Sequence, residues 1–446
     1  MELNKVNYKK NVKPYEYHKP YKAGKGWGGF AHLLFKLGWK KNVKKIEKID
    51  MDGVRAPYVL ISNHQTFTDF AVNTMAIYPD HFGAIATFEG HMGFPKSLRP
   101  WALKHAGCIP KRKFTTDAQL IDDCKTVLDE YKNVLILYPE ARYTDIGTTS
   151  YIHESYGQLL KMLDHPVVAI VQKGSYLREP FWNWQKKRKV KTVATMKKIL
   201  DVEDLRRMTP DEILEVVRRE LNHDEYKYQK ENNILIKEKF RAEGLNKALY
   251  QCPNCLTEFE MESKGTKLWC NHCGKEWEMS ELGELRATVG DTEFTHIPDW
   301  YNWEHENVRK EVAEGKYSFE DDVDIYTLPN MKGFIHIGKG KIRHSREEGV
   351  VVEGHYNGED FKIVRPSAGL YSIHTEYNYP HIIKKPCIHV STKDDTFICY
   401  TTKKDVVTKV YFAVDSINKQ IMKERAEKRA NRLAKKSSES VNESSD

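Results

Sequence analysis

Long hydrophobic runs are absent from this 446-residue sequence. No apolar stretch approaches the roughly 20 residues that a helix needs to cross a bilayer. The N-terminal segment, MELNKVNYKKNVKPYEYHKP, is polar and lacks the apolar core of a signal peptide. The sequence therefore argues against a membrane-spanning helix and against a secretory signal.

Cysteine is also sparse, with eight residues in the whole chain. Four of them form two C-x-x-C pairs and the other four are scattered, which excludes a dense disulfide framework. Paired cysteines in a chain without a signal predict a reducing cytosolic compartment and a bound metal.

The charge surplus is small, at +8, but it is concentrated. Lys36 to Lys48 and Lys186 to Lys198 are both rich in lysine. Such patches suit phosphates, anionic membrane surfaces or nucleic acid, and an ordinary solvated surface explains them equally well.

Apolar runs of strand length alternate with helical stretches in the first half of the chain. The runs are Tyr58–Ser62, Phe82–Thr87, Gly107–Pro110, Val134–Tyr138 and Pro166–Val171. This alternation is typical of an α/β fold with a mostly parallel sheet covered by helices on both faces. In such folds the chemistry collects in loops beyond the carboxyl ends of the strands.

One of these strand ends carries a histidine and a carboxylate. In YVLISNHQTFTDF, residues 58–70, His64 follows the apolar run and Asp69 opens the next helical stretch. Two side chains so placed can form a general base and the carboxylate that orients it. A histidine has an ordinary pKa of about 6.5, so the neutral base is available at neutral pH.

Two further motifs follow apolar runs. GCIPKRK, residues 107–113, places a turn and a short strand before three cations, and YPEAR, residues 138–142, puts an acid and a base at a strand exit. His64 and Glu140 both lie just past strand ends, so we expect them on the same edge of the sheet.

Four motifs resemble, in their order, those of the glycerolipid acyltransferase family. They are H-x4-D, the basic G-x-I motif, P-E-x-R and the apolar Pro166–Val171 run. That family includes the glycerol-3-phosphate and lysophosphatidate acyltransferases, and the resemblance covers roughly residues 25–200. It implies that His64 is the general base on an acceptor hydroxyl, oriented by Asp69. The hydroxyl would attack an acyl thioester of acyl-carrier protein or coenzyme A.

The same resemblance implies substrate-binding roles for Arg112, Lys113, Glu140 and Arg142. The family arginine of the second motif falls at Lys113, and we favour Arg112 as the phosphate ligand because a guanidinium binds phosphate through two donors. The family pattern P-E-G-T-R reads P-E-A-R at residues 139–142, with the arginine one residue early. These departures are compatible with an acceptor other than a simple phosphomonoester.

Residues 252–273 carry the spacing C-x2-C-x14-C-x2-C. Two such knuckles bring four thiolates to one tetrahedral zinc, and Gly274 permits the turn after the second pair. Four sulfur ligands leave no open position, so the zinc is predicted to be structural. The predicted ligands are Cys252, Cys255, Cys270 and Cys273.

Residues 318–402 contain seven short alternating stretches separated by Gly, Asp and Pro, and a helical stretch follows at Asp405–Gln420. This pattern predicts a small β-rich domain closed by a helix, with a pleckstrin-homology-like shape. The tail from Met422 is charged and then Ser-rich, and we expect it to fray into disorder.

WGGFAHLLFKLGW, residues 27–39, predicts a short helix with tryptophan at both ends and lysines after it. Two interpretations stay open. The helix lies in the lipid headgroup region, or it docks on the domain core. Both hold if one face of the helix meets lipid and the opposite face meets the core.

These features predict seven segments. They are an N-terminal arm (1–24), an acyltransferase domain (25–200), a helical connector (201–249), a zinc ribbon (250–280), a second connector (281–317), a β-rich domain with its closing helix (318–420) and the tail (421–446).

The predicted function is transfer of a fatty acyl group from a thioester to a hydroxyl of a lysophospholipid acceptor, foremost 1-acylglycerol 3-phosphate, in phospholipid biosynthesis. The predicted location is cytoplasmic, on the inner face of a membrane. The main alternative is an inactive lipid-binding scaffold that uses the ribbon and β-rich domain for partners, which the altered P-E-A-R motif favours and the intact H-x4-D pair opposes. Nucleic-acid binding through the ribbon is least favoured, because the basic residues lie mostly in the acyltransferase segment.

Overall fold

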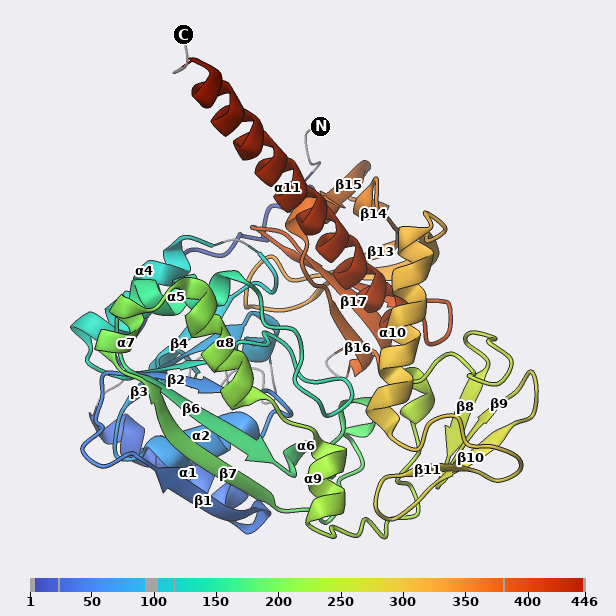
Figure 1. Ribbon diagram of the computed structural model, residues 1–446, viewed down its shortest axis with the longest axis horizontal. Helices are drawn as coiled ribbons and strands as arrows, with labels where there is room; N and C mark the ends of the chain where they lie inside the picture. The colour runs from blue at the N-terminus through green and yellow to red at the C-terminus, as the bar shows by residue number, and fades with distance from the viewer. Residues whose placement is uncertain (1–4, 23–24, 93–102, 116, 380–381, 444–446) are drawn as a thin grey trace.

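The structure is a computed structural model that describes residues 5–22, 25–92, 103–115, 117–379 and 382–443 (Figure 1). The first four residues of the predicted arm and the last three of the predicted tail lie outside these ranges.

A seven-stranded sheet forms the core of the N-terminal half. Its order is β1 (Val43–Ile49), β7 (Thr192–Leu200), β6 (Val167–Lys173), β2 (Val59–Ser62), β5 (Val134–Leu137), β3 (Phe82–Thr87) and β4 (Cys108–Lys111). Neighbours from β6 to β4 are parallel, whereas β7 runs antiparallel to β6 and β1 pairs parallel with β7. The sheet is therefore mixed and mostly parallel, and all five predicted strands are present.

The central strands are buried on both faces because helices cover both sides (Figure 1). On one face Leu60 packs in a cluster with Val72 and Ala76 of α2 (Asp69–Ile77). On the other face Val59 and Ile61 pack in a cluster with residues of α5 (Ser155–Leu163) and α8 (Pro210–Leu221). Alternate residues of one strand thus serve two cores, which explains the continuous apolar runs.

The sequence did not predict β1 and β7, which overlap the two lysine-rich stretches. Their sequences, VKKIEKI and TVATMKKIL, mix lysine with apolar residues. β1 is the edge of the sheet, and its lysines, Lys44, Lys45 and Lys48, are exposed. Charged residues are common on edge strands, and there they hide the strand pattern.

A helical segment and a small second sheet follow. The helices are α7 (Val202–Arg207), α8 and α9 (Glu225–Glu231), and the sheet has the order β11 (Leu285–Ala287), β10 (Glu276–Met279), β9 (Lys267–Cys270) and β8 (Met261–Lys264). α10 (Ile297–Ala313) packs on this sheet, with the rings of Trp300 and Trp277 at 4.9 Å between centroids.

The C-terminal sheet has seven antiparallel strands, as many as the sequence predicts. The order is β15 (Glu359–Arg365), β14 (Gly349–Tyr356), β13 (Ile335–Ser345), β12 (Phe319–Thr327), β18 (Thr396–Thr401), β17 (Lys385–Ser391) and β16 (His374–Tyr379). The pleckstrin-homology-like shape stays a prediction.

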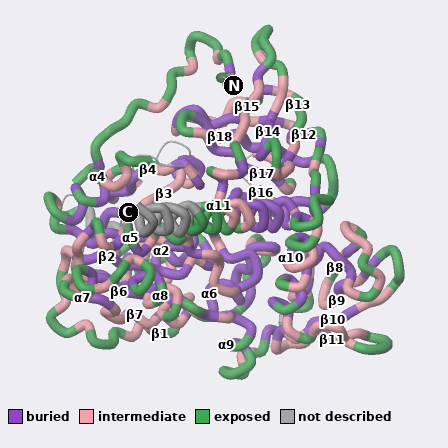
Figure 2. The backbone as a smooth tube through the Cα atoms, turned by 45° about the horizontal axis from the view of Figure 1, so that its top comes forward, coloured by how far each residue is buried: buried purple, intermediate pink, exposed green. Residues whose placement is uncertain are grey.

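The closing helix is longer than expected. α11 runs from Val407 to Glu443 as one 37-residue helix and projects from the body of the molecule (Figure 1). Its first turns are buried and the following turns are exposed (Figure 2). The alanine, lysine, arginine and glutamate of the predicted tail are good helix formers, which explains the continuation.

Candidate active site

The loop after β2 is held to the end of β6 by one asparagine. The Asn63 side-chain amide donates to the Gln172 carbonyl at 2.8 Å and accepts from the Gln172 backbone N–H at 2.8 Å. Gln172 in turn donates to the Asp69 carbonyl at 3.0 Å. The turn that carries His64 is therefore fixed to the carboxyl ends of two neighbouring strands.

His64 and Asp69 form the predicted pair. His64 Nδ1 lies 3.2 Å from Asp69 Oδ2, and that oxygen also accepts the backbone N–H groups of Gln65 and Thr66 at 2.5 and 2.8 Å. Because the carboxylate can only accept, Nδ1 carries the proton and Nε2 carries the lone pair. Asp69 is fully buried and the His64 side chain is 18% exposed.

Burial lowers the pKa of His64 below its ordinary value, and the hydrogen bond and charge of Asp69 oppose that shift. The imidazole is therefore a neutral base at pH 7. It stacks on the ring of Tyr138 at 3.9 Å between centroids and meets Tyr143 at 4.2 Å. These rings fix the plane of the imidazole.

Glu140 supports the His64 loop through its two carboxylate oxygens. Oε1 accepts the His64 backbone N–H at 2.9 Å, and Oε2 accepts the Ser150 backbone N–H at 2.6 Å. The Thr144 backbone N–H donates to the His64 carbonyl at 2.8 Å. Burial raises the pKa of Glu140 to about 7. Within the described residues this geometry gives Glu140 a positioning role; its predicted contact with substrate stays a prediction.

Arg142 turns into the protein rather than toward His64. Its Nη2 donates to both Asp145 oxygens at 2.8 and 2.7 Å, and its guanidinium lies 3.7 Å from the Tyr411 ring centroid on α11. Ala141 before it has φ 53°, in the left-handed region that favours the glycine of the family motif.

The Arg112 guanidinium also forms hydrogen bonds within the protein. Its guanidinium donates to the carbonyls of Leu328, Pro329 and Asp394 and to Thr396 Oγ1, at 2.8 to 3.0 Å. All four acceptors belong to the C-terminal β-rich part of the chain. The structure therefore does not bring Arg112 to His64, and the phosphate-binding role we favoured for Arg112 stays a prediction.

Lys113 is the member of the basic motif whose charge reaches the candidate base, because it lowers the pKa of His64. Burial in turn lowers the pKa of Lys113 itself. The predicted substrate contacts of Lys113 and Arg142 stay predictions.

Two residues that hold the site in place were not predicted from the sequence. Tyr138 lies inside the YPEAR motif, so its place beside His64 was open to inference. Glu225 is 161 residues away from His64, and no local signal marks it. Its carboxylate accepts from Gln65 Nε2 at 2.8 Å and from the Gly174 N–H at 2.7 Å.

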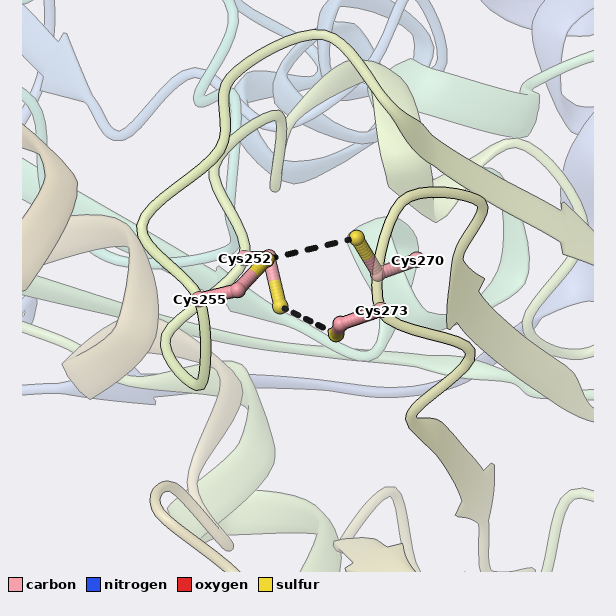
Figure 3. Close-up of side chains that lie close together, drawn as sticks. All are labelled: Cys252, Cys255, Cys270 and Cys273. Carbon is pink, nitrogen blue, oxygen red and sulfur yellow. Dashed lines mark hydrogen bonds between the residues drawn. The ribbon is translucent and has the colours of Figure 1, made fainter.

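The four predicted zinc ligands come together beside the second sheet, in the loop before β8 and in the turn that begins at the end of β9 (Figure 3). Their sulfur atoms lie within 4.8 Å of one another, and the pairs Cys252–Cys273 and Cys255–Cys270 are 3.7 Å apart. Tetrahedral bonds of about 2.3 Å place sulfur atoms about 3.8 Å apart, so the group fits zinc.

A histidine with a buried carboxylate, at the carboxyl edge of a mostly parallel sheet, is an arrangement that can take a proton from a hydroxyl. The family model described as Acyltransferase matches residues 40–173, so this part of the chain is an acyltransferase-family domain.

Among solved structures, the chain is similar to the 1-acyl-sn-glycerophosphate (LPA) acyltransferase PlsC from Thermotoga maritima. The identity is 16% and the TM-score 0.34, over 43% of this chain and 77% of that chain. No curated protein matches the chain. Within the described residues, no helix is long and apolar enough to cross a membrane.

Proposed function

We propose that this protein transfers a fatty acyl group from an acyl thioester to a hydroxyl of a lysophospholipid, with 1-acylglycerol 3-phosphate as the leading acceptor. The observation that carries the proposal is the His64–Asp69 pair inside the family-matched range. The donor is a thioester of acyl-carrier protein or coenzyme A.

In this reaction His64 Nε2 takes the proton of the acceptor hydroxyl while the oxygen attacks the thioester carbonyl. The new oxygen–carbon bond forms, the carbon–sulfur bond breaks, and the imidazolium returns the proton to the leaving thiolate. Asp69 stabilises the imidazolium, as a buried carboxylate does for a transient cation. Lys113 supplies positive charge for the phosphate of the acceptor.

A membrane surface is the proposed location of the acceptor. α1 (Lys25–Trp39) exposes four large apolar side chains: Phe30, Leu33, Leu34 and Leu37, at 47%, 51%, 50% and 74%. Lysines follow the helix and continue along β1. Apolar side chains beside lysines suit the headgroup region of an anionic bilayer.

The cysteine group would hold a structural zinc, because its four sulfurs leave no open position for substrate. No step of the reaction passes through it. The C-terminal sheet and its helix would take the pleckstrin-homology-like shape that their pattern predicts.

The direct test is acyl transfer by purified His64→Ala and Asp69→Asn, screened on lysolipid acceptors with both thioester types. His64→Ala removes the general base and Asp69→Asn removes the carboxylate that orients it and stabilises its cation, so we expect losses of about 100- to 10,000-fold. His355→Ala is the matched control, because His355 is 63% exposed on β14. Undiminished turnover in His64→Ala rejects the mechanism.

The same screen separates the enzyme from the scaffold alternative. A scaffold would bind lysolipid without consuming thioester, in the unaltered protein as in both variants. Release of free thiol that depends on acceptor and on His64 supports the enzyme.

A further inference from the structure

The backbone of Gln65 fixes the carboxylate that faces His64. Asp69 Oδ2, which lies 3.2 Å from His64 Nδ1, accepts the Gln65 backbone N–H at 2.5 Å. The direction of this N–H therefore helps to decide where the oxygen lies relative to the imidazole. A displacement of about 1 Å in such a contact can lower a rate on the order of 100-fold.

The side chain of Gln65 lies in a buried hydrogen-bond network that leads out of the family-matched range, residues 40–173. Gln65 is 1% exposed, and Glu225 of α9 is fully buried. Gln65 Oε1 accepts the Tyr176 backbone N–H at 3.1 Å, and Gln65 Nε2 donates to Glu225 Oε1 at 2.8 Å. Glu225 Oε2 accepts the Gly174 backbone N–H at 2.7 Å. Gln65 is therefore held at both atoms of its amide.

Glu225 is itself fixed at the start of α9. Its backbone N–H donates to the Gly147 carbonyl at 2.9 Å. The carboxylate of Asp224 caps the helix by accepting the N–H groups of Tyr226 and Lys227, both at 3.0 Å. The Glu225 carboxylate thus offers Gln65 a fixed acceptor.

The ends of this network dictate the chemistry of the two side chains between them. Both ends are backbone N–H groups, of Tyr176 and Gly174, which can only donate. One carboxylate and one amide satisfy all three contacts, in either order. Two amides would turn an NH2 group toward a donor, and two carboxylates would face each other through oxygen atoms. A buried polar group left without its partner costs more than the hydrogen bond itself contributes.

We propose that Gln65 and Glu225 are positioning residues for catalysis, and that their amide–carboxylate contact keeps the Gln65 N–H on Asp69 and thereby the Asp69 carboxylate on His64 Nδ1. The inference rests on the proposed acyl transfer and extends the catalytic unit beyond the family-matched range to α9. Because both residues act through Asp69, their effect falls on kcat rather than on KM.

The test exchanges the two groups. Glu225→Gln alone gives two amides, and Gln65→Glu alone gives two carboxylates. The double variant, Gln65→Glu with Glu225→Gln, gives one of each in reversed order and keeps all three hydrogen bonds.

Kinetics are measured on the full-length protein at pH 8.5, where Glu225 is ionised. Each single change should lower kcat about tenfold, with KM for acceptor and thioester within about twofold. The double variant should recover most of the lost kcat. The two single variants fail for different reasons, so either one carries the test should the other not fold.

Glu231→Gln is the matched control, because it neutralises an exposed acid at the end of the same helix. Its kcat should equal that of the unaltered protein. Full kcat in the single variants overturns the proposal, and so does a loss that the double variant does not recover.

A second measurement needs no turnover. The hydrogen bond to Asp69 holds the proton of neutral His64 on Nδ1, whereas a neutral imidazole in water prefers the proton on Nε2. Nuclear magnetic resonance of ring-labelled histidine distinguishes the two tautomers, and the His64 signal is the one that disappears in His64→Ala. The Nδ1–H form should dominate in the unaltered protein and in the double variant, and the single variants should shift toward the Nε2–H form.

The two measurements separate this inference from the proposed function. An unshifted tautomer in the single variants overturns the positioning role, whether or not any acceptor is turned over. Absence of acyl transfer by the unaltered protein counts against the proposed function alone, and the tautomers then decide the positioning role.

Discussion

At the scale of single residues, two opposed effects set the pKa of His64. Burial disfavours the imidazolium, and the Asp69 carboxylate at 3.2 Å favours it, with a net pKa below the ordinary value. A base that is neutral at pH 7 and still has a carboxylate for its cation suits proton transfer in both directions.

The pH dependence of acyl transfer tests this balance. Protonated His64 cannot act as a base, so kcat/KM should fall toward acid pH with a midpoint below about 6.5. In Asp69→Asn the carboxylate no longer favours the imidazolium, so the midpoint should shift to still lower pH while activity drops throughout. The measurement is a pH–rate profile for both proteins.

Circular dichroism over the same pH range controls for unfolding. An acid limb centred above 6.5, or one that stays in place in Asp69→Asn, would show that another group governs the profile.

At the scale of elements, α1 is packed on one face and exposed on the other. It packs against α2, while Leu33, Leu34 and Leu37 point to solvent. The contact with α2 agrees with the docked interpretation, and the headgroup interpretation, in which the exposed face meets lipid, stays a prediction.

Replacing Leu33, Leu34 and Leu37 together by serine should weaken binding to vesicles that contain anionic lipid, because burial of each leucine contributes on the order of 1–2 kcal/mol. Flotation of protein with vesicles measures the bound fraction. Leu235→Ser, at a residue 45% exposed outside α1, is the control. Equal flotation of the triple variant would assign membrane contact to another surface.

At the scale of the whole molecule, a chain of contacts joins the cysteine group to the catalytic loop. The ribbon sheet packs on α10 through Trp277 and Trp300. Tyr301 of α10 donates to Asp145 Oδ2 at 2.8 Å, and Asp145 holds Arg142, two residues from Glu140. The ribbon therefore helps to place the loop on which His64 rests.

Removal of the metal should disturb both the ribbon and catalysis. A four-cysteine zinc site contributes on the order of 10 kcal/mol to folding of its module, so Cys252→Ser should lose metal and lower thermal stability and kcat together. Metal analysis should find about one zinc per chain in the unaltered protein.

His272→Ala is the control, because His272 is exposed beside the cluster but is not one of its four members. Full activity and unchanged melting in the metal-free protein would show that the ribbon is independent of the site.

The His64–Asp69 pair and the four-cysteine group were predictable from the sequence because each depends on short spacings. His64 and Asp69 share one turn, and the cysteines sit in two tight knuckles. The five buried strands were readable because both of their faces are apolar. The lysine-bearing strands β1 and β7 were not. β1 is an edge strand, where charge is tolerated, and β7 beside it carries half-buried lysines among its apolar residues.

The partners of the basic residues were decided by the tertiary structure alone. Arg112 finds its acceptors more than 200 residues away, and Arg142 finds Tyr411 on the last helix. The local sequence around these two cations does not reveal either partner. Long-range hydrogen bonds and ring contacts, formed only when the C-terminal sheet and helix pack on the first domain, determine them.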